Sequence, residues 1–307
     1  MVHIIKGKYK ITRLIGNDEM ASVYEAENEM IGTKVAIQVL NPILSANIQI
    51  KERFRNEAKL LESLDHPNIT KVIDFDDQPK QLSIVKEYLN RENLNEKIER
   101  TGPLTEKEIV EIFSQTLSAF EFAHENGMFH GYLKPDDIFF HETEGEIDLS
   151  TNDLGVYAII EKINIKILGF EKRVLFDNNY TSLIQNHGAR AFITPEELMI
   201  GTDAIDYKSD IYCIGLILFY VVTGLKPNFY CGYKLNGNNS INPFPEYEYT
   251  DSQKKFKRII NKACQPNKKD RYDSFRVFKN EILNLSKHND SIPKSRWKNL
   301  KKLFGYE

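Results

Sequence analysis

The sequence predicts an α+β protein, with a small β-rich part at the front and a larger helical part behind it. Short β-prone runs separated by turn residues fill the front of the chain, and helical spacing of apolar residues dominates from Thr105 onward. The 307 residues are 41% hydrophobic and 28% charged, which is ordinary for a globular protein. This length is sufficient for one large domain or two lobes around a real core.

The front part is expected to contain strands and one helix. Gly32 and Thr33 have the composition of a hairpin turn between two of the strands. Apolar residues at helical spacing follow these strands. The expected elements are, in order, strands over Tyr9–Ile15, Ser22–Glu27 and Lys34–Leu40, a helix over Gln49–Leu64, and strands near Ile69–Phe75 and Leu82–Glu87.

The back part carries clear helix signals. Thr105 and Glu108 form a capping-box pattern that opens a long amphipathic helix to about Asn126, and Gly127 ends it. The longest apolar run, Ile211–Val222, is too short to cross a bilayer and predicts a buried core helix. The boundary between the two parts is expected near residues 88–93.

Composition excludes several classes of protein. The net charge of −3 makes no case for a nucleic-acid or membrane-surface protein. The three cysteines lie far apart without a metal-binding spacing, so reduced thiols in a cytoplasmic protein are expected. The first residues lack the apolar core and cleavage site of a signal peptide.

Six short motifs lie in register with these elements. They are Val35–Gln38, Glu57, His130–Pro135, Gly169–Glu171, Thr194–Glu196 and Asp210–Gly215. Together they resemble the two-lobed protein kinase fold, with Val35–Gln38 for V-A-I-K, His130–Pro135 for the catalytic loop, Gly169–Glu171 for D-F-G, Thr194–Glu196 for A-P-E, and Arg271 as the partner of Glu196. The resemblance covers about Tyr9–Leu285, and the run Gly188–Glu196 is similar to the serine/threonine type. It implies an N-lobe over 1–88, a C-lobe over 89–287 and a tail over 288–307.

The resemblance also implies where the residues of phosphoryl transfer should stand. Gln38 occupies the place of the lysine that binds the phosphates, and Tyr132 that of the catalytic aspartate. Asp137 and Gly169 occupy the places of the asparagine and aspartate that hold magnesium. In the glycine-rich loop only Gly16 remains, followed by the acidic pair Asp18 and Glu19.

By contrast, the residues that support the fold in this family are expected to be present in the sequence. The expected hydrophobic spine and its supports are Leu61, Val72, His130, Phe170, Asp210 and the pair Glu196–Arg271. The favoured hypothesis is therefore a catalytically inactive pseudokinase that regulates or scaffolds a protein partner and binds little or no ATP, with no cofactor and no metal ion. The alternative is a residual or atypical ATP-dependent phosphotransferase or nucleotidyl transferase on a kinase fold.

A vestigial nucleotide cleft is expected around Gly16, Val23, Ala36, Lys86 and Phe139. We expect Lys86, at the gatekeeper position, to point inward and pair with Glu57; the competing interpretation places it in solvent. Phe139 and Leu168 would reduce the adenine space. An acidic metal site formed by Asp136, Asp137 and Glu171 is a less favoured alternative.

Two additions extend the plain fold. Residues 141–162 carry six acidic residues against one lysine, which predicts a solvated loop, a longer hairpin or a docking element. The tail is a basic amphipathic segment around Trp297, expected to pack on the C-lobe, with membrane contact less favoured. The expected partner is a protein, for example an active kinase or another signalling protein, and not a nucleic acid.

Overall fold

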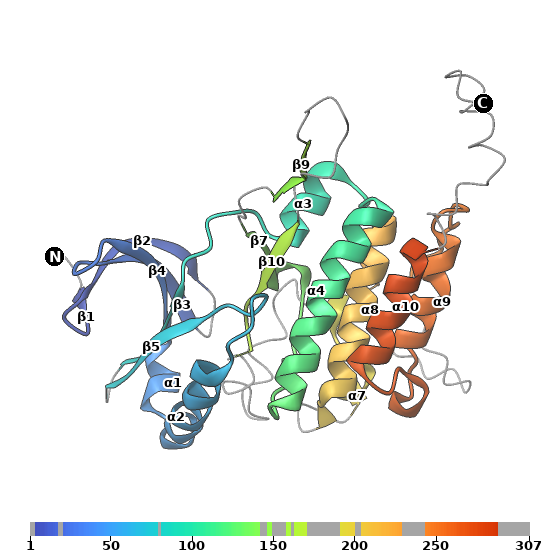
Figure 1. Ribbon diagram of the computed structural model, residues 1–307. Helices are drawn as coiled ribbons and strands as arrows, with labels where there is room; N and C mark the ends of the chain where they lie inside the picture. The colour runs from blue at the N-terminus through green and yellow to red at the C-terminus, as the bar shows by residue number, and fades with distance from the viewer. Residues whose placement is uncertain are drawn as a thin grey trace.

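The computed structural model describes residues 4–17, 21–78, 81–141, 146–148, 158–160, 163–170, 191–199, 204–228 and 243–287. Figure 1 shows a strand-rich lobe, coloured blue to cyan, beside a larger helical lobe, coloured green to red. The predicted α+β class and its two-lobed form are confirmed.

The N-lobe is built on a six-stranded antiparallel sheet with the order β1-β2-β3-β4-β6-β5. β-Branched and aromatic residues, which favour strands, recur along these segments. The strands are β1 (Ile4–Ile5), β2 (Tyr9–Asn17), β3 (Ala21–Asn28), β4 (Thr33–Leu40), β5 (Val72–Gln78) and β6 (Gln81–Glu87).

Two helices, α1 (Pro42–Ala46) and α2 (Ile48–Ser63), follow β4. Each begins at an asparagine whose side chain accepts hydrogen bonds from the first turn: Asn41 from Ile43 N, and Asn47 from the backbone of residues 49 and 50. Figure 1 shows both helices packed below the sheet.

The two faces of the N-lobe sheet bury different clusters. Val35, Ile37 and Val85 belong to a small cluster with Ile5, Tyr9 and Ala26. Because side chains alternate along a strand, their neighbours Ile84 and Leu40 face the other way. Those residues join the main core, which continues through α2 into the C-lobe.

The strand expected to start near Ile69 starts at Val72 instead. Ile69 forms a parallel bridge with Ile167, and Thr70 N donates to Ile167 O at 2.9 Å. Ile167 ends a C-lobe strand, so these residues tie the two lobes together and cannot pair within the N-lobe sheet.

The C-lobe is helical. The Thr105 and Glu108 capping box is present, since each residue's side chain bonds the other's backbone N–H. Gly127, with φ of +76°, follows the end of that helix. The main helices are α3 (Leu94–Thr101), α4 (Glu106–Glu125), α7 (Pro195–Met199), α8 (Tyr207–Thr223), α9 (Lys254–Ala263) and α10 (Phe275–Lys287).

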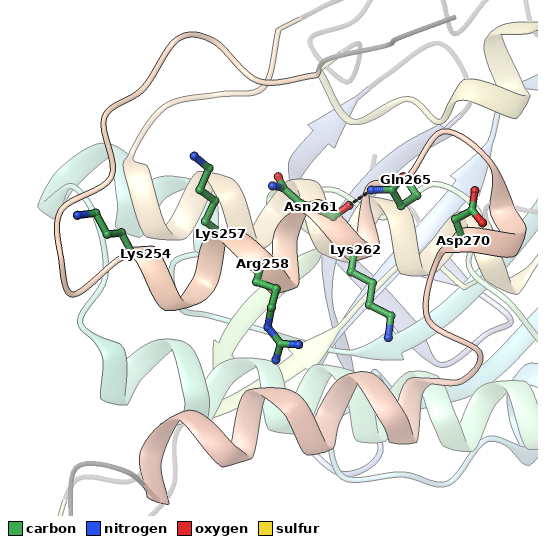
Figure 2. A pocket seen from close by; sticks show the side chains of 7 residues that line it. All are labelled: Lys254, Lys257, Arg258, Asn261, Lys262, Gln265 and Asp270. Carbon is green, nitrogen blue, oxygen red and sulfur yellow. Dashed lines mark hydrogen bonds between the residues drawn. The ribbon is translucent and has the colours of Figure 1, made fainter.

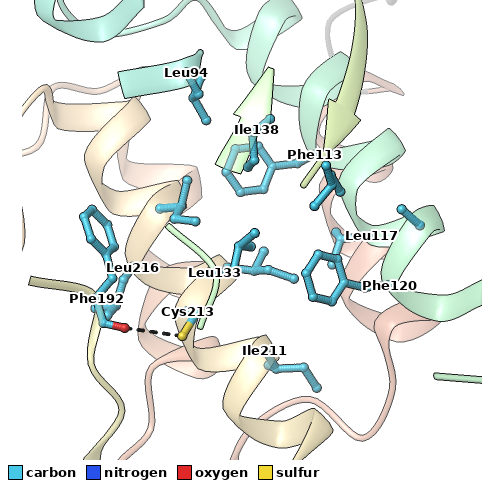
Figure 3. Close-up of a cluster of buried hydrophobic side chains, with 14 of the residues drawn as sticks. Leu94, Phe113, Leu117, Phe120, Leu133, Ile138, Phe192, Ile211, Cys213 and Leu216 are labelled. Carbon is cyan, nitrogen blue, oxygen red and sulfur yellow. Dashed lines mark hydrogen bonds between the residues drawn. The ribbon is translucent and has the colours of Figure 1, made fainter. Parts of the chain in front are cut away.

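Helix α8 is the buried centre of the C-lobe, as its apolar run predicts. A Cβ added at Gly215 would lie 2.6 Å from Cys264 Sγ and 2.7 Å from Ala263 Cβ, so glycine allows α9 to approach α8. Figure 3 shows the core around Leu133, Phe120 and Leu216. None of the helices in the described ranges is long and apolar enough to span a membrane.

Short strands carry the catalytic loop and its surroundings. β7 (Ile138–His141) pairs antiparallel with β10 (Asn164–Ile167). Between them, β8 (Glu146–Asp148) and β9 (Ala158–Ile160) form an antiparallel pair inside the acidic insert. The rest of the insert and the tail 288–307, including Trp297, lie outside the described residues.

Candidate functional site

The catalytic loop lies between α4 and β7 and is held by one buried carboxylate. Asp210 accepts hydrogen bonds from His130 N at 2.8 Å and from Gly131 N at 2.6 Å. Asp210 is fully buried. Gly131 has φ of +80°, a conformation that favours glycine. The loop is therefore fixed from beneath by α8, which carries Asp210.

His130 links this loop to the segment after β10. Its Nε2 donates to Leu168 O at 2.8 Å, and its ring centroid lies 5.0 Å from that of Phe170. Phe120 of α4 packs against Phe170 at 5.3 Å. Leu61 and Val72 are also buried, and both belong with Phe170 to the main core. Each of the four residues expected for the hydrophobic spine thus lies inside the protein.

Asp137 sits at the end of the short 3₁₀ turn η1 (Pro135–Asp137) and is 5% exposed. Its Oδ2 accepts from Lys134 N at 3.2 Å, and its carbonyl accepts from Leu168 N at 2.8 Å. These bonds fix a carboxylate on the catalytic loop next to the segment that leads to Gly169.

Magnesium in proteins is usually bound by one or two carboxylates together with substrate phosphates. Asp137 fits the role of one such carboxylate. No cluster of three or more His, Cys, Asp or Glu side chains is found within the described ranges. Asp136 instead accepts from Asn95 Nδ2 at 3.5 Å, and Glu171 lies outside the described residues.

Gly169 replaces the family's second magnesium ligand, and the backbone shows why another side chain would be strained there. Its φ is +101°. L-residues other than glycine rarely adopt this conformation. Restoring an aspartate at this position would therefore require the backbone to change. Tyr132, in the place of the catalytic aspartate, is half-buried, and its N–H donates to His130 Nδ1 at 3.2 Å.

The face of the sheet that carries Gln38 also carries Lys86. Lys86 of β6 pairs with Ala36 of β4, and Gln38 lies diagonally from it. The Nζ of Lys86 donates to Gln38 Oε1 at 2.8 Å, and both residues are buried, at 5% and 8% exposure. Lys86 therefore points into the protein. The side chain of Glu57, its expected partner, lies outside what the structure describes.

The other residues expected to line the cleft lie on strands β2, β3, β4 and β7. Gly16 pairs with Val23 between β2 and β3, and Ala36 is 9% exposed. Phe139 lies half-buried on β7, where it pairs with Lys166. The acidic pair Asp18 and Glu19 falls outside the described residues.

Lys34, on the same strand as Gln38, is engaged elsewhere. Its Nζ lies 2.9 Å from Glu25 Oε1, and its side chain is 63% exposed. Arg13 and Tyr88 also contact Glu25. Hydrogen bonds from Lys34, Tyr88 and Arg13 lower the pKa of Glu25 to about 2. Lys34 is therefore not a substitute for the missing lysine.

Glu196 and Arg271 form a buried ion pair in the C-lobe. Arg271 Nη1 and Nη2 donate to the two carboxylate oxygens at 2.8 and 2.7 Å. Ser209 Oγ adds a third donor at 2.5 Å. Burial alone would raise the pKa of Glu196, but the hydrogen bonds and charge of Arg271 outweigh it, so the pKa is lowered.

The neighbouring Glu197 behaves in the opposite way. Its burial, together with the negative charge of Glu196, raises its pKa from 4.5 to about 7, against a backbone hydrogen bond at Thr194. Between pH 4.5 and about pH 7, the carboxylate of Glu197 therefore holds a proton more often in the folded chain than in the unfolded chain. The free energy of unfolding should therefore fall as pH rises from about 4.5 to about 7.

Glu197→Gln removes this titration without changing the side-chain shape. We expect the variant to be more stable than the wild type at pH 8, by an amount on the order of 3 kcal/mol at most, and little changed at pH 4.5. Urea denaturation at both pH values measures the difference. An equal stability difference at both pH values would contradict this expectation.

A basic groove runs along α9, away from the catalytic loop. Figure 2 shows its side chains projecting from α9 and the following turn. Arg258 and Lys262 lie 3.3 and 3.9 Å from Glu281 of α10, and Lys254 lies 2.7 Å from Asp251. These pairs identify a solvated charged surface, so the catalytic loop and the sheet face that carries Lys86 and Gln38 remain the candidate site.

The protein kinase domain family matches residues 9–283. This chain belongs to the protein kinase family. The kinase domain is 32% identical over 223 residues to serine/threonine-protein kinase PrkC of Bacillus subtilis, a match that covers 73% of this chain and 31% of PrkC. It is 29% identical over 297 residues to serine/threonine-protein kinase pkn3 of Myxococcus xanthus, covering 94% of this chain and 52% of pkn3. The chain thus spans about half or less of the length of these relatives.

Solved structures show the same fold. The kinase domain of Mycobacterium tuberculosis PknI matches with a TM-score of 0.63 and 19% identity, over 92% of this chain and 98% of that one. A second structure of that domain gives a TM-score of 0.66 at 18% identity, over 91% and 96% of the two chains.

The prediction that the chain is not an enzyme is contradicted by its relatives. PrkC, pkn3 and PknA of Mycobacterium tuberculosis, which is 29% identical over 228 residues, are all named serine/threonine-protein kinases. The prediction rested on the residues missing from the motifs. In the fold, a lysine ammonium lies beside Gln38, and Asp137 places a carboxylate where the family has a neutral asparagine. The site thus keeps charged groups although Tyr132 and Gly169 replace two of the family's aspartates.

Sequence reasoning missed the contact between Lys86 and Gln38. The sequence carried part of the signal, because Lys86 directly follows the apolar residues Ile84 and Val85 of its strand. The contact itself depends on the register of β4 against β6, which periodicity along either strand does not specify.

Proposed function

We propose that this chain is an atypical, slow ATP-dependent phosphotransferase that modifies serine or threonine hydroxyl groups of a protein. The observation that supports it best is the assembled catalytic loop. Asp210 fixes its backbone, the ring of His130 on the loop meets that of Phe170 edge-on at 5.0 Å between centroids, and Asp137 presents a buried carboxylate on it. Serine and threonine are proposed as acceptors because the similar proteins are named serine/threonine-protein kinases.

Asp137 is the residue proposed to hold magnesium with the phosphates of ATP. Bound there, magnesium would neutralise negative charge on the phosphates. Lys134 N, which donates to Asp137 Oδ2, keeps the carboxylate oriented. Asp210 contributes by holding the loop, not by contacting a substrate.

The reaction is expected to be slow because Tyr132 stands where the family has an aspartate. A phenol is a poor base at neutral pH, since tyrosine ordinarily ionises near pH 10. General base catalysis contributes about 10²–10⁴-fold to a rate. A turnover number lower by about that factor than the 1–100 s⁻¹ common for kinases is therefore expected.

The function is tested with the purified chain, ATP labelled at the γ-phosphate, magnesium and a mixture of unrelated proteins. We expect label in protein, and at least a tenfold loss of labelling in Asp137→Ala, in line with the strength of charge-assisted contacts of roughly 1.5–3 kcal/mol. Asp136→Ala is the matched control, because this neighbouring carboxylate bonds Asn95 and should matter little. Equal labelling by the wild type and Asp137→Ala would refute the proposal.

A further inference from the structure

We infer that Lys86 supplies, from strand β6, the phosphate-binding cation that the family places at the position of Gln38. This inference rests on the proposed function, because it assigns a residue to ATP in the same cleft. Lys86 is then a binding residue that contacts the phosphates.

The first step is the direction of the side chain. Val85 and Glu87 flank Lys86 on β6, and Val85 lies in the cluster on the outer face of the sheet. Side chains alternate along a strand, so Lys86 faces the opposite side, together with Ile84. Ile84 belongs to the main core shared with Leu61 of α2. Lys86 therefore faces the interior between the sheet and α2.

The second step is the reach of the side chain. Glutamine and lysine have the same first three side-chain carbons, so Gln38 Oε1 stands about where the Cε of a lysine at position 38 would stand. Lys86 Nζ lies 2.8 Å from that oxygen. The ammonium of Lys86 is thus within about one hydrogen-bond length of the place where a lysine at 38 would carry its own.

The third step is the role of Gln38. Its neutral amide oxygen accepts from the ammonium and so holds Lys86 across the strand pair. A lysine at position 38 would place two cations in this space, and like charges this close in a buried setting repel strongly. Gln38 and Lys86 therefore act as a pair. The cation that the family carries on β4 stands here on β6, and the neutral side chain stands on β4.

The fourth step excludes the nearest other lysine. Lys34 lies on the same strand as Gln38, but its ammonium contacts Glu25 and its side chain is 63% exposed. Lys86 is 5% exposed. The ammonium of Lys86 is hydrogen-bonded to Gln38, and we therefore assign it as the cation of this part of the cleft.

The test measures binding of ATP and of adenosine, each with magnesium, by calorimetry on the full chain. Lys86→Met removes the charge and keeps the length of the side chain. A cation on the phosphates should matter for ATP alone, so we expect ATP affinity to fall about tenfold to a hundredfold and adenosine affinity to stay within about twofold. Lys34→Met is the matched control and should change neither.

The exchange variant Gln38→Lys/Lys86→Met returns the cation to the family position. It should restore ATP affinity to within a few-fold of the wild type. If Lys86→Met does not fold, the exchange variant is measured in its place. Equal losses for ATP and adenosine, failure of the exchange to restore binding, or no ATP binding by the wild type would each overturn the inference.

This result is separable from that of the proposed function. Binding of ATP through Lys86 without transfer of phosphate would support the inference and refute the phosphotransferase. Transfer of phosphate that is unaffected in Lys86→Met would do the reverse.

Discussion

Replacing Arg271 by alanine is expected to lower the free energy of unfolding by about 3–5 kcal/mol, because it leaves a buried carboxylate without its cation. Arg271 has a fully buried side chain and bonds both oxygens of Glu196. Its guanidinium also donates to the carbonyls of Gln265 and Lys208 and lies 4.6 Å from the ring centroid of Tyr212. Arg271→Ala therefore removes a hydrogen-bond partner from Glu196, Gln265 and Lys208 at once.

Arg276→Ala is the matched control for that variant. Arg276 pairs with Glu121 at 2.6 Å, but its side chain is 68% exposed. Exposed pairs contribute about 0–1 kcal/mol. Guanidinium denaturation of both variants measures the contrast. Equal destabilisation by the two substitutions would show that burial of the Glu196–Arg271 pair is not what stabilises the C-lobe.

Replacing Tyr132 by aspartate is expected to raise the turnover number by about 10²–10⁴-fold, the usual contribution of a positioned general base. The loop that carries residue 132 is already held by Asp210 and His130, so a carboxylate there has a fixed backbone. Steady-state rates of phosphate transfer at saturating ATP measure the gain.

Tyr132→Asn is the control, because it has the size of aspartate without a base. It should show no gain. Tyr132→Asp should also gain little in a Lys86→Met background, since catalytic parts that act as a unit are not additive. A gain of equal size in the asparagine and aspartate variants would mean that relief of crowding, and not a base, raises the rate.

The fold could be predicted from the sequence because its signals are local. The Thr105–Glu108 capping box and the apolar run of α8 give elements whose bounds differ by only a few residues in the structure. The short helix α1, which follows β4 directly, gave no periodic signal and was not predicted. The bridge of Ile69 to Ile167 shortened β5 because it depends on a partner almost a hundred residues away.

The candidate site was predictable only in part. Motif spacing predicted the positions of His130 and Asp137 on the catalytic loop and of Asp210 on α8, because each lies in a short contiguous motif. The partner of Lys86 was not predictable in this way. Gln38 meets it across two strands that are far apart in the chain, so the charge at the site belongs to a pair of residues and not to one motif position.

The central claim is that the chain transfers phosphate from ATP to protein hydroxyl groups. Mass spectrometry of a peptide library incubated with the purified chain, ATP and magnesium tests it most directly. We predict phosphoserine or phosphothreonine in the peptides treated with wild type, and a loss of at least about tenfold with Asp137→Ala and with Lys86→Met. Peptides that remain unmodified by the wild type and by Tyr132→Asp alike would contradict the claim.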